Sequence, residues 1–325
     1  MTSPFAALSG TRFHKGHGTE NDFVLLDDDN GDLTLHPETV ALLADRQTGL
    51  GGDGVIRIVR SADSGIPGAA EQAAAGAEWF MDYYNHDGSL SEMCGNGVRV
   101  FAHALVTTGR VPADAPEIKV ATRDGIKTVR TTLNPALGET DPATEASTVR
   151  IPGSPEDAWY TVDMGAWSLD DRAEVLVTTD GIDVARPGLS VETGNPHTVV
   201  ALAEAAELAA ADLRDYPVLD PVPPHGSNVE YIVMEPARSD VAGGEGALRM
   251  RVSERGVGET RSCGTGACAA AIAAHHWAGA ASPLQWRVDV PGGRLRIGIT
   301  PDQTGTAGTV TLAGPAVLVA SGTLD

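Results

Sequence analysis

The sequence predicts an α+β protein of two pseudo-symmetric domains, each a curled, barrel-like antiparallel sheet around one central buried helix. Three observations lead to this prediction. The chain has 325 residues, which at about 100–200 residues per domain suggests two domains. Short strand-like runs recur through both halves. A cysteine followed by Gly-x-Gly occurs once in each half, before an apolar helical segment, which indicates an internal duplication.

The predicted strands are short runs in which apolar and polar residues alternate between Gly, Pro, Asp or Asn boundaries. This pattern is typical of strands with one buried face. These runs span residues 23–26, 54–59, 78–84, 117–121, 127–132, 148–151, 174–178, 229–234, 248–252, 295–299 and 309–312.

Four segments are expected to be helical. Residues 37–47 and 198–213 have helical periodicity. Residues 98–108 and 267–278 are apolar on nearly every side, and a helix without a polar face belongs in a core. Each of these two helices is therefore expected along the axis of a curled antiparallel sheet.

Two further segments are expected to be insertions, and a third is expected to be a turn. Residues 61–77 are rich in Ala, Gly and Ser, and residues 134–158 are rich in Pro, Thr and acidic residues. Both are expected to be insertions with little order. The run from Asp27 to Asp29 is expected to be a solvated turn.

The duplicated phrase reads Cys94-Gly95-Asn96-Gly97 in the first half and Cys263-Gly264-Thr265-Gly266 in the second. Glycines before a helix let the backbone come close to a ligand, and the free N–H groups there favour an anion. The same field is expected to lower the pKa of each thiol from about 8.5 toward neutrality. A carboxylate could then sit on both helix ends, with one sulfur on each side of the adjacent carbon.

Two thiols across one carbon are what an amino-acid racemase or epimerase requires. One thiolate removes the α-proton from one face, the opposite thiol delivers a proton to the other, and the roles exchange with direction. A carboxylate bound at the two helix ends, in a cavity that excludes water, can stabilise the developing carbanion. Neither a metal nor a pyridoxal cofactor is therefore expected.

The remaining cysteine and two histidines have a simpler interpretation. Cys268 lies inside the second apolar helix and is expected to be a packing residue. A zinc site can be drawn from Cys263, Cys268, His275 and His276, but helical positions five apart do not face one way. No metal site is therefore predicted.

Glycine-rich loops elsewhere carry amides and charges, namely Asn21, Asn85, Asn195, Asn228 and the pair Glu254-Arg255. Any one of these residues is more often a turn or cap than a site, because Asn suits both. Together they supply several neutral amides, one guanidinium and one carboxylate. That set suits a zwitterionic amino acid.

Composition narrows the class of protein and its location. With 42% hydrophobic residues and 23 basic against 44 acidic residues, the chain is globular with a net charge of −21. Nucleic acid and membrane surfaces are therefore not expected as partners. No segment reaches the roughly 18 apolar residues of a membrane span, and residues 1–15 show no secretory signal. Three cysteines cannot form a disulfide framework. The protein is expected to be cytoplasmic, with reduced thiols.

At these motifs the sequence resembles the diaminopimelate epimerase family over nearly its whole length. The resemblance is carried by five ordered blocks: residues 21–23, 85–89, 94–97, 194–197 and 254–268. It implies interconversion of LL- and meso-diaminopimelate, on the route to lysine and peptidoglycan precursors. It also implies a cofactor-independent mechanism in which Cys94 faces the α-proton of the LL isomer and Cys263 that of the meso isomer.

The resemblance further implies a role for each matching residue. His197 and Glu254 match residues that tune the two thiols. The positions that match groups holding the substrate amines and carboxylates are Asn21, Asn85, Asn195, Asn228, Glu254 and Arg255, with backbone groups of Gly95, Asn96, Gly264 and Thr265 around the reacting carboxylate.

The resemblance implies a first domain of residues 1–165 completed by a returning strand, 312–325, and a second domain of residues 166–311. It also implies a homodimer. Three positions depart from the family pattern. Glu20 stands where Gly is more frequent, Gly54 stands where some members have a substrate-contacting Gln, and Ala320 replaces a Tyr that supports the family dimer.

Two alternatives remain open. One is another cysteine-pair racemase of the proline or hydroxyproline type, which would need a small apolar pocket where Arg255 and the amides lie. The other is a non-enzymatic redox or binding protein in which Cys94 and Cys263 form a switchable disulfide. Exchange of a substrate α-hydrogen with solvent deuterium would be seen only with an enzyme.

Overall fold

The computed structural model describes residues 5–133, 158–169, 175–238, 243–279 and 281–325. The chain forms two compact units: unit 1 is Met1–Val162 with Gly314–Asp325, and unit 2 is Asp163–Ala313. It passes from unit 1 to unit 2 within strand β7 (Ala158–Leu169) and returns within β17 (Ala307–Pro315). The sequence-based boundaries fall inside these same two strands.

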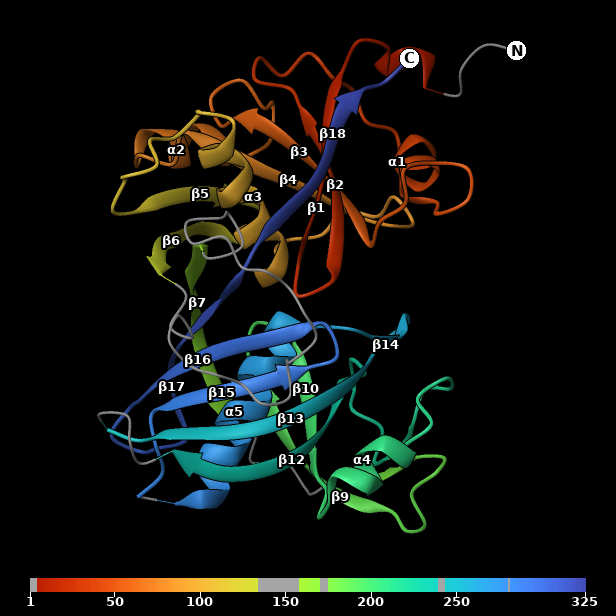
Figure 1. Cartoon of the computed structure of the whole chain (residues 1–325), viewed down its shortest axis with the longest axis vertical. Helices are drawn as coiled ribbons and strands as arrows, with labels where there is room; N and C mark the ends of the chain where they lie inside the picture. The colour runs from red at the N-terminus through yellow and green to blue at the C-terminus, as the bar shows by residue number, and fades with distance from the viewer. Residues whose placement is uncertain (1–4, 134–157, 170–174, 239–242, 280) are drawn as a thin grey trace, which may run out of the picture. The chain divides into compact units, whose positions relative to one another are not determined.

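Unit 1 is one curled sheet whose neighbouring strands follow the order β18-β1-β2-β3-β4-β5-β6-β7 (Figure 1). Its strands are β1 (Arg12–Gly18), β2 (Asn21–Asp27), β3 (Gly54–Arg60), β4 (Trp79–Asn85), β5 (Ile118–Thr122), β6 (Gly125–Leu133) and β18 (Val317–Thr323). Its helices are α1 (Pro37–Ala44), α2 (Ala69–Ala74) and α3 (Gly95–Thr107), after a short 3-10 helix, Ala6–Leu8. The pairs β2–β3 and β4–β5 are parallel, and the other pairs are antiparallel.

Unit 2 closes into a barrel, because β7 pairs with both β9 and β17 at the ends of the series β7-β9-β10-β12-β13-β15-β16-β17. These strands are β9 (Arg186–Glu192), β10 (Pro196–Ala201), β12 (Asn228–Arg238), β13 (Glu245–Glu254), β15 (Gln285–Val290) and β16 (Gly293–Pro301). Outside this series lie β8 (Val175–Thr178), β11 (Val218–Asp220) and β14 (Gly258–Thr260). The helices are α4 (Ala205–Ala210) and α5 (Gly264–Ala278).

The internal duplication is visible in the order of pairings. In unit 1 a parallel connection links β2 to β3 through α1, and a second links β4 to β5 through α3. In unit 2 the parallel pairs are β10–β12, with α4 between them, and β13–β15, with α5 between them. Each barrel-like sheet is therefore mixed, with two parallel pairs that arise because a helix intervenes.

The two apolar helices predicted from the sequence are confirmed, and both lie inside the sheets (Figure 1). Every residue of α3 from Gly95 to Leu105 is buried, and Ala267 to Ala274 of α5 are inaccessible to solvent. Helix α5 contacts β9, β10, β12, β13 and β16. Its alanines fit because a helix enclosed by a closed barrel has little room for larger side chains.

Helix α3 carries two buried polar side chains, and both have partners in unit 1. Arg99 is fully buried, and its guanidinium lies 3.4 Å from Thr19 Oγ1 and 3.4 Å from the Pro315 carbonyl oxygen. His103 Nδ1 lies 2.9 Å from the Tyr160 hydroxyl. Burial lowers the pKa of His103 to about 4 and raises the pKa of Tyr160 to about 12. This pair is therefore neutral at physiological pH.

The predictions for residues 198–213 and for Asp27 to Asp29 were wrong. Residues 198–213 do not form one helix: Pro196–Ala201 is strand β10, and only Ala205–Ala210 is helical. Val199 and Val200 favour a strand because they are β-branched and can pack between β9 and β12. Asp27 to Asp29 is not a solvated turn, because Asp28 is buried and paired with Arg57 at 3.1 Å.

The predicted insertions have different outcomes. The expectation of little order was wrong for segment 61–77, because it contains α2 and because Ser61 Oγ donates a hydrogen bond to the Ala77 carbonyl at 2.6 Å. Residues 134–157 lie outside the described residues. They include the strand predicted at 148–151 and all of the predicted insertion except Ala158.

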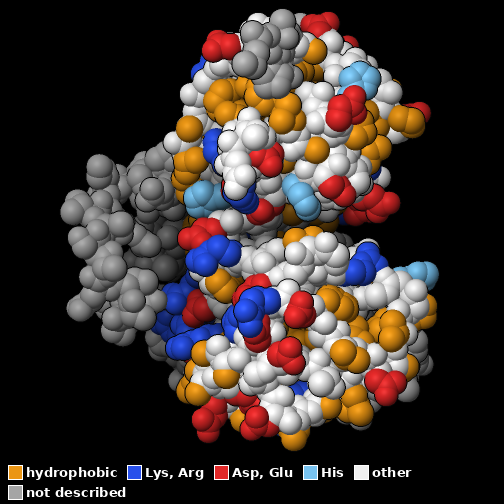
Figure 2. Space-filling model, turned by 90° about the vertical axis from the view of Figure 1, so that its right-hand side faces the viewer, with side chains coloured by type: hydrophobic (Ala, Val, Ile, Leu, Met, Phe, Trp, Pro, Cys, Tyr) orange, Lys and Arg blue, Asp and Glu red, His pale blue; other side chains and the backbone are white. Residues whose placement is uncertain are grey.

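Charged side chains of both signs interleave on the face drawn in Figure 2. Basic side chains gather at one edge of unit 2 in that view. On the β13–β15–β16 sheet, the arginines pair with acidic neighbours: Arg249 and Arg287 with Glu235, Arg294 with Asp289, and Arg296 with Glu245. Among the described helices, none has the length and apolar character needed to cross a bilayer.

Candidate active site

The cysteine of unit 1 caps the first turn of α3. Cys94 is in an extended conformation at the N-cap, and its Sγ accepts a hydrogen bond from the Gly97 N–H at 3.4 Å. Within the described part of the chain Cys94 forms no disulfide bond, and it is partly exposed. Gly95 and Asn96 occupy the first helical positions, where backbone N–H groups have no intrahelical acceptor. The Cys94 thiol therefore lies at the start of a buried helix, beside the backbone N–H groups of its first turn.

Asn21 brings the β1–β2 hairpin to Cys94. Its Oδ1 accepts from Asn96 Nδ2 at 3.0 Å and lies 3.7 Å from the Cys94 sulfur. The preceding turn residues Thr19 and Glu20 have φ values of 53° and 61°. Glycine or asparagine normally occupies such positions in a two-residue hairpin, so the departure at Glu20 is accommodated in a left-handed conformation. Asn21 and Cys94 are therefore close together in unit 1.

Asp53 holds the side chain of Asn21 in place and was missed by the sequence analysis. Its Oδ2 accepts from Asn21 Nδ2 at 2.7 Å and from the Asp22 N–H at 3.1 Å, while Arg46 binds Oδ1 at 2.7 Å. With its N–H₂ group bound to Asp53, Asn21 presents its carbonyl oxygen to Cys94 and Asn96. Asp53 lies in a glycine-rich segment, residues 49–54, to which the sequence analysis assigned no role.

Asn85 lies at the end of β4, opposite Gly54 at the start of β3. Its Nδ2 donates to Ser89 Oγ at 3.0 Å, and the N–H of His86 donates to the Asp53 carbonyl at 3.1 Å. Asn85 and Asn21 therefore flank the same Asp53–Gly54 backbone. The predicted residues of unit 1 converge on the start of β2, the end of β4 and the start of α3.

The cysteine of unit 2 repeats the geometry of Cys94. Cys263 is the N-cap of α5, and its Sγ accepts from the Gly266 N–H at 3.4 Å and lies 3.5 Å from Thr265 Oγ1. A Cβ at Gly266 would lie 2.6 Å from Glu230 Oε1 and 3.3 Å from the Cys263 sulfur, so a larger residue there would have to displace these side chains. Cys268 is fully buried within α5, in agreement with its predicted packing role.

The expected lowering of the cysteine pKa is wrong for Cys263. Burial raises the pKa of this thiol well above its ordinary value, and the negative charges of Glu254 and Glu230 raise it further. Hydrogen bonds from Thr265 and the Gly266 N–H act in the opposite direction but are weaker. The helix N-terminus alone was considered in the prediction, whereas two strands place carboxylates beside it. Cys263 is therefore a thiol at neutral pH.

Asn228, Glu254 and Arg255 lie at one end of the β12–β13 pair. Asn228 Oδ1 accepts from the Arg255 N–H at 3.0 Å, and the Arg255 guanidinium binds the His225 carbonyl. Thr260 donates to the Glu254 carboxylate. Arg255 is exposed, so its guanidinium can also reach an anionic ligand. These residues lie at the start of β12 and the end of β13. Asn21 and Asn85 have corresponding positions in unit 1, at the start of β2 and the end of β4.

His197 is fully buried between Asn195 and Glu230. Its Nδ1 lies 2.7 Å from Glu230 Oε1 and its Nε2 lies 3.0 Å from Asn195 Oδ1. Glu230 is a second residue that the sequence analysis missed. The sequence feature that could have identified Glu230 is a charged residue within an otherwise apolar strand. It lies two positions after Asn228 and therefore on the same face of β12.

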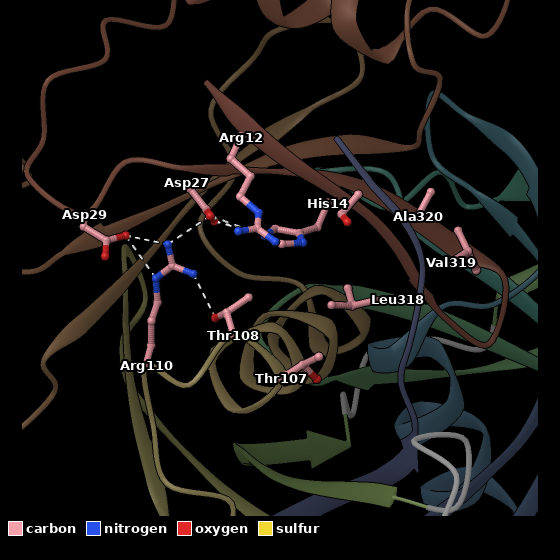
Figure 3. A pocket seen from close by; sticks show the side chains of 11 residues that line it. Arg12, His14, Asp27, Asp29, Thr107, Thr108, Arg110, Leu318, Val319 and Ala320 are labelled. Atoms are coloured by element: carbon pink, nitrogen blue, oxygen red, sulfur yellow. Dashed lines mark hydrogen bonds and ion pairs between the residues drawn. The ribbon is translucent and has the colours of Figure 1, made fainter. Parts of the chain in front are cut away.

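A cavity of about 590 Å³ in unit 1 is lined by none of the predicted site residues (Figure 3). Its charged walls pair with one another, since Arg110 lies 3.1 Å from Asp27 and 2.6 Å from Asp29. Burial alone would raise the pKa of Asp27, but hydrogen bonds from His14 and Arg110 hold it below its ordinary value. Asp27, Asp29 and Arg110 in this cavity therefore compensate one another's charges.

Comparisons with known proteins identify the family. A family model described as diaminopimelate epimerase matches residues 13–142 and 189–319. The chain is similar to proteins named diaminopimelate epimerase from Rhodococcus jostii (43% identical), Streptomyces coelicolor (42%) and Corynebacterium glutamicum (40%). The matches cover 96%, 96% and 99% of this chain and 96%, 95% and 98% of those relatives. This chain belongs to the diaminopimelate epimerase family. It is therefore an isomerase.

Solved structures at low sequence identity share the fold. A Bacillus anthracis phenazine biosynthesis protein of the PhzF family matches with a TM-score of 0.66 and 15% identity, over 97% of this chain and 99% of that one. A hydroxyproline epimerase from Agrobacterium vitis matches with a TM-score of 0.57 and 14% identity, over 96% and 91%. These matches support the fold class of two curled sheets around central helices.

We predict that Asp53→Asn lowers kcat/KM for the epimerase substrate by about tenfold or more, because a hydrogen bond to a charged group is worth roughly 1.5–3 kcal/mol. The neutral amide would no longer fix the Asn21 side chain. Steady-state kinetics measures the effect. The matched control Asp63→Asn changes an exposed aspartate of the same unit and should leave kcat/KM unchanged. Equal kinetics for both variants would contradict the role assigned to Asp53.

We also predict the pH dependence of Cys263 alkylation. Because its pKa is raised, the rate of iodoacetamide labelling should be low at neutral pH and rise only in the alkaline range. Glu254→Gln removes a negative charge and should therefore move this rise to lower pH. Peptide mass spectrometry at a series of pH values measures the labelling. Rapid labelling of the wild-type Cys263 at neutral pH would show that its thiolate is stabilised instead.

Proposed function

We propose that the protein interconverts LL- and meso-diaminopimelate without a cofactor, using Cys94 and Cys263 as the acid–base pair. The observation that carries the proposal is the repeated geometry of the two thiols. Each is the N-cap of a buried helix, with its sulfur 3.4 Å from the N–H of the glycine three residues on. Membership of the diaminopimelate epimerase family supports the choice of substrate.

The proton transfers follow from the chemistry of the two thiols. For the LL isomer, the Cys94 thiolate removes the α-proton from one face and the Cys263 thiol delivers its proton to the other face. The raised pKa of Cys263 supports this starting state, because the proton donor must be protonated before reaction. In the reverse direction the roles exchange, and the pair titrates as one coupled system.

Substrate recognition is proposed to use the polar groups around each thiol. The amides of Asn21, Asn85, Asn195 and Asn228 hold amines and carboxylates, and Arg255 binds a carboxylate. Backbone N–H groups of Gly95 and Asn96, and of Gly264 and Thr265, stabilise the reacting carboxylate as negative charge spreads into it. Glu254 and His197 are proposed to tune the thiols. A proline-type substrate would leave the exposed guanidinium of Arg255 without an anionic partner.

The cellular role follows from this reaction. The protein is proposed to act in the cytoplasm, on the route to lysine and to peptidoglycan precursors. It is also proposed to form a homodimer through the face that contains β18. Ala320 lies on this strand beside Val319, whose side chain is 57% exposed. The exposed side chain of Val319 is proposed to contact the second copy.

We predict that Cys94→Ala and Cys263→Ala each lower the epimerisation rate by at least about 10²-fold in both directions, because each removes a general acid–base group. Chiral chromatography of the diaminopimelate isomers measures the rate. Cys268→Ala, a change at the buried packing cysteine, should retain activity. Near-normal turnover by either of the first two variants, with circular dichroism unchanged, would refute the two-thiol assignment.

We predict that Val319→Glu converts the dimer to a monomer, because a buried carboxylate without a partner is costly. Sedimentation velocity measures the mass. Val184→Glu, at a similarly exposed valine of unit 2, should leave the dimer intact. A monomeric wild-type protein, or a Val319→Glu protein that remains dimeric, would show that this face is not the interface.

A further inference from the structure

Arg255, whose guanidinium is proposed to bind a substrate carboxylate, is exposed but held at two points. Its backbone N–H donates to Asn228 Oδ1 at 3.0 Å, at the start of β12. Its guanidinium donates to the carbonyl oxygen of His225. Ordering a long side chain when a ligand binds costs free energy. An arginine that is already anchored can therefore bind an anion with less of this loss.

The turn that supplies the His225 carbonyl is encoded by the local sequence. Residues 223–226 read Pro-Pro-His-Gly, and the Gly226 N–H donates to the Pro223 carbonyl at 2.9 Å. Proline at the second position of a β-turn fixes φ, and glycine is favoured at the fourth. The carbonyl of His225, the third residue, takes no part in this turn hydrogen bond. It is therefore available to the guanidinium of Arg255.

Gly226 gives the Arg255 side chain the room to cross the turn. Its φ of 68° lies in the left-handed region that favours glycine. A Cβ at this position would lie 2.6 Å from Arg255 Cδ and 3.4 Å from Arg255 Cγ. Any side chain at residue 226 would thus displace the aliphatic part of Arg255. The glycine meets both requirements at once, the turn and the close approach.

Tyr216 fixes the far end of the same turn. It precedes β11 in the chain, and its hydroxyl donates to the carbonyl of Ser227. Ser227 is buried, and its Oγ lies 2.9 Å from Thr198 Oγ1 on β10, which ties this residue to the barrel. Burial raises the pKa of Tyr216, and the nearby positive charge of Arg255 offsets only part of this rise. The phenol therefore keeps its proton at neutral pH and remains a donor.

We propose that Tyr216 and Gly226 are positioning residues for Arg255: they hold the turn of residues 223–227 so that the His225 carbonyl fixes the guanidinium before the substrate binds. The guanidinium has more N–H donors than this one bond uses, so a bidentate contact with a carboxylate stays open. The kinetic consequence rests on the proposed function, in which Arg255 binds substrate. The order of the Arg255 side chain is independent of any substrate.

Unit 2 offers a matched control for each residue. Tyr231 is also a tyrosine with a hydroxyl partner, since its oxygen lies 2.6 Å from Thr179 Oγ1. Gly305 has a φ of 70°, and a Cβ there would meet no atom within 4 Å. Tyr231→Phe therefore removes a comparable hydroxyl, and Gly305→Ala imposes comparable backbone strain. Neither change touches the turn of residues 223–227.

The first test is nuclear magnetic resonance of the full chain labelled with 15N-arginine, with the Arg255 Nε signal assigned from its loss in Arg255→Lys. In the wild type, the heteronuclear 15N nuclear Overhauser effect of this signal should match that of the ordered backbone. In Tyr216→Phe and in Gly226→Ala it should fall to the value of a mobile side chain. Tyr231→Phe and Gly305→Ala should not change it.

The second test is steady-state kinetics with LL-diaminopimelate. Tyr216→Phe and Gly226→Ala should each raise KM by about two- to tenfold, the range expected when one long side chain must be ordered on binding. The change in kcat should be smaller. In an Arg255→Lys background, Tyr216→Phe should have little further effect on KM, because both changes act through one contact. The two control variants should keep the KM of the wild type.

Each outcome decides the proposal. A mobile Arg255 side chain in the wild-type protein overturns it, and this measurement does not require that any variant folds. An Arg255 signal that stays ordered in Tyr216→Phe, or an unchanged KM in that variant, also overturns it, whether or not Gly226→Ala folds. An equal rise of KM in either control overturns it as well, because the cause is then a general loss of stability. If the wild type does not turn over diaminopimelate, the proposed function fails, while the resonance test still reports on Arg255 separately.

Discussion

The first turn of a buried helix is the constraint on which this structure depends. A thiol at the N-cap can accept a backbone N–H only if the next residues let the chain turn closely around it, and a Cβ at Gly266 would collide with a neighbouring carboxylate. The helix must also be enclosed, because neither α3 nor α5 has a polar face to offer solvent. A curled sheet that surrounds each helix satisfies both conditions, and the duplication repeats the solution in each unit.

The amides near each thiol owe their orientation to groups that are not part of any motif. In unit 1 the carboxylate of Asp53 binds the N–H₂ group of Asn21 and turns its carbonyl toward the sulfur. In unit 2 the pair of Glu230 and His197 binds the carbonyl of Asn195. In unit 1 the N–H₂ end of the Asn21 side chain is bound, whereas in unit 2 the carbonyl end of the Asn195 side chain is bound.

Local patterns were sufficient to predict much of the fold and of the site. The two apolar helices, most of the strands and the position of each thiol before its helix follow from periodicity and from the duplicated phrase. The helix expected at 198–213 failed because its apolar spacing suits a helix while its β-branched residues pack as a strand between two neighbours. Asp53, Glu230 and the raised pKa of Cys263 were not predictable, since each depends on partners brought together by sheet register rather than by sequence separation.

Isotope incorporation during the first turnovers in deuterated water tests the two-thiol account most directly. Each thiol exchanges its hydrogen with solvent, so the acid that reprotonates the α-carbon delivers deuterium while the base retains the hydrogen it removed. Starting from unlabelled LL-diaminopimelate, mass spectrometry should find deuterium at the α-carbon of the meso product and none in the recovered LL substrate. Early label in the recovered LL isomer, or meso product without label, would mean that a single group both removes and returns the proton.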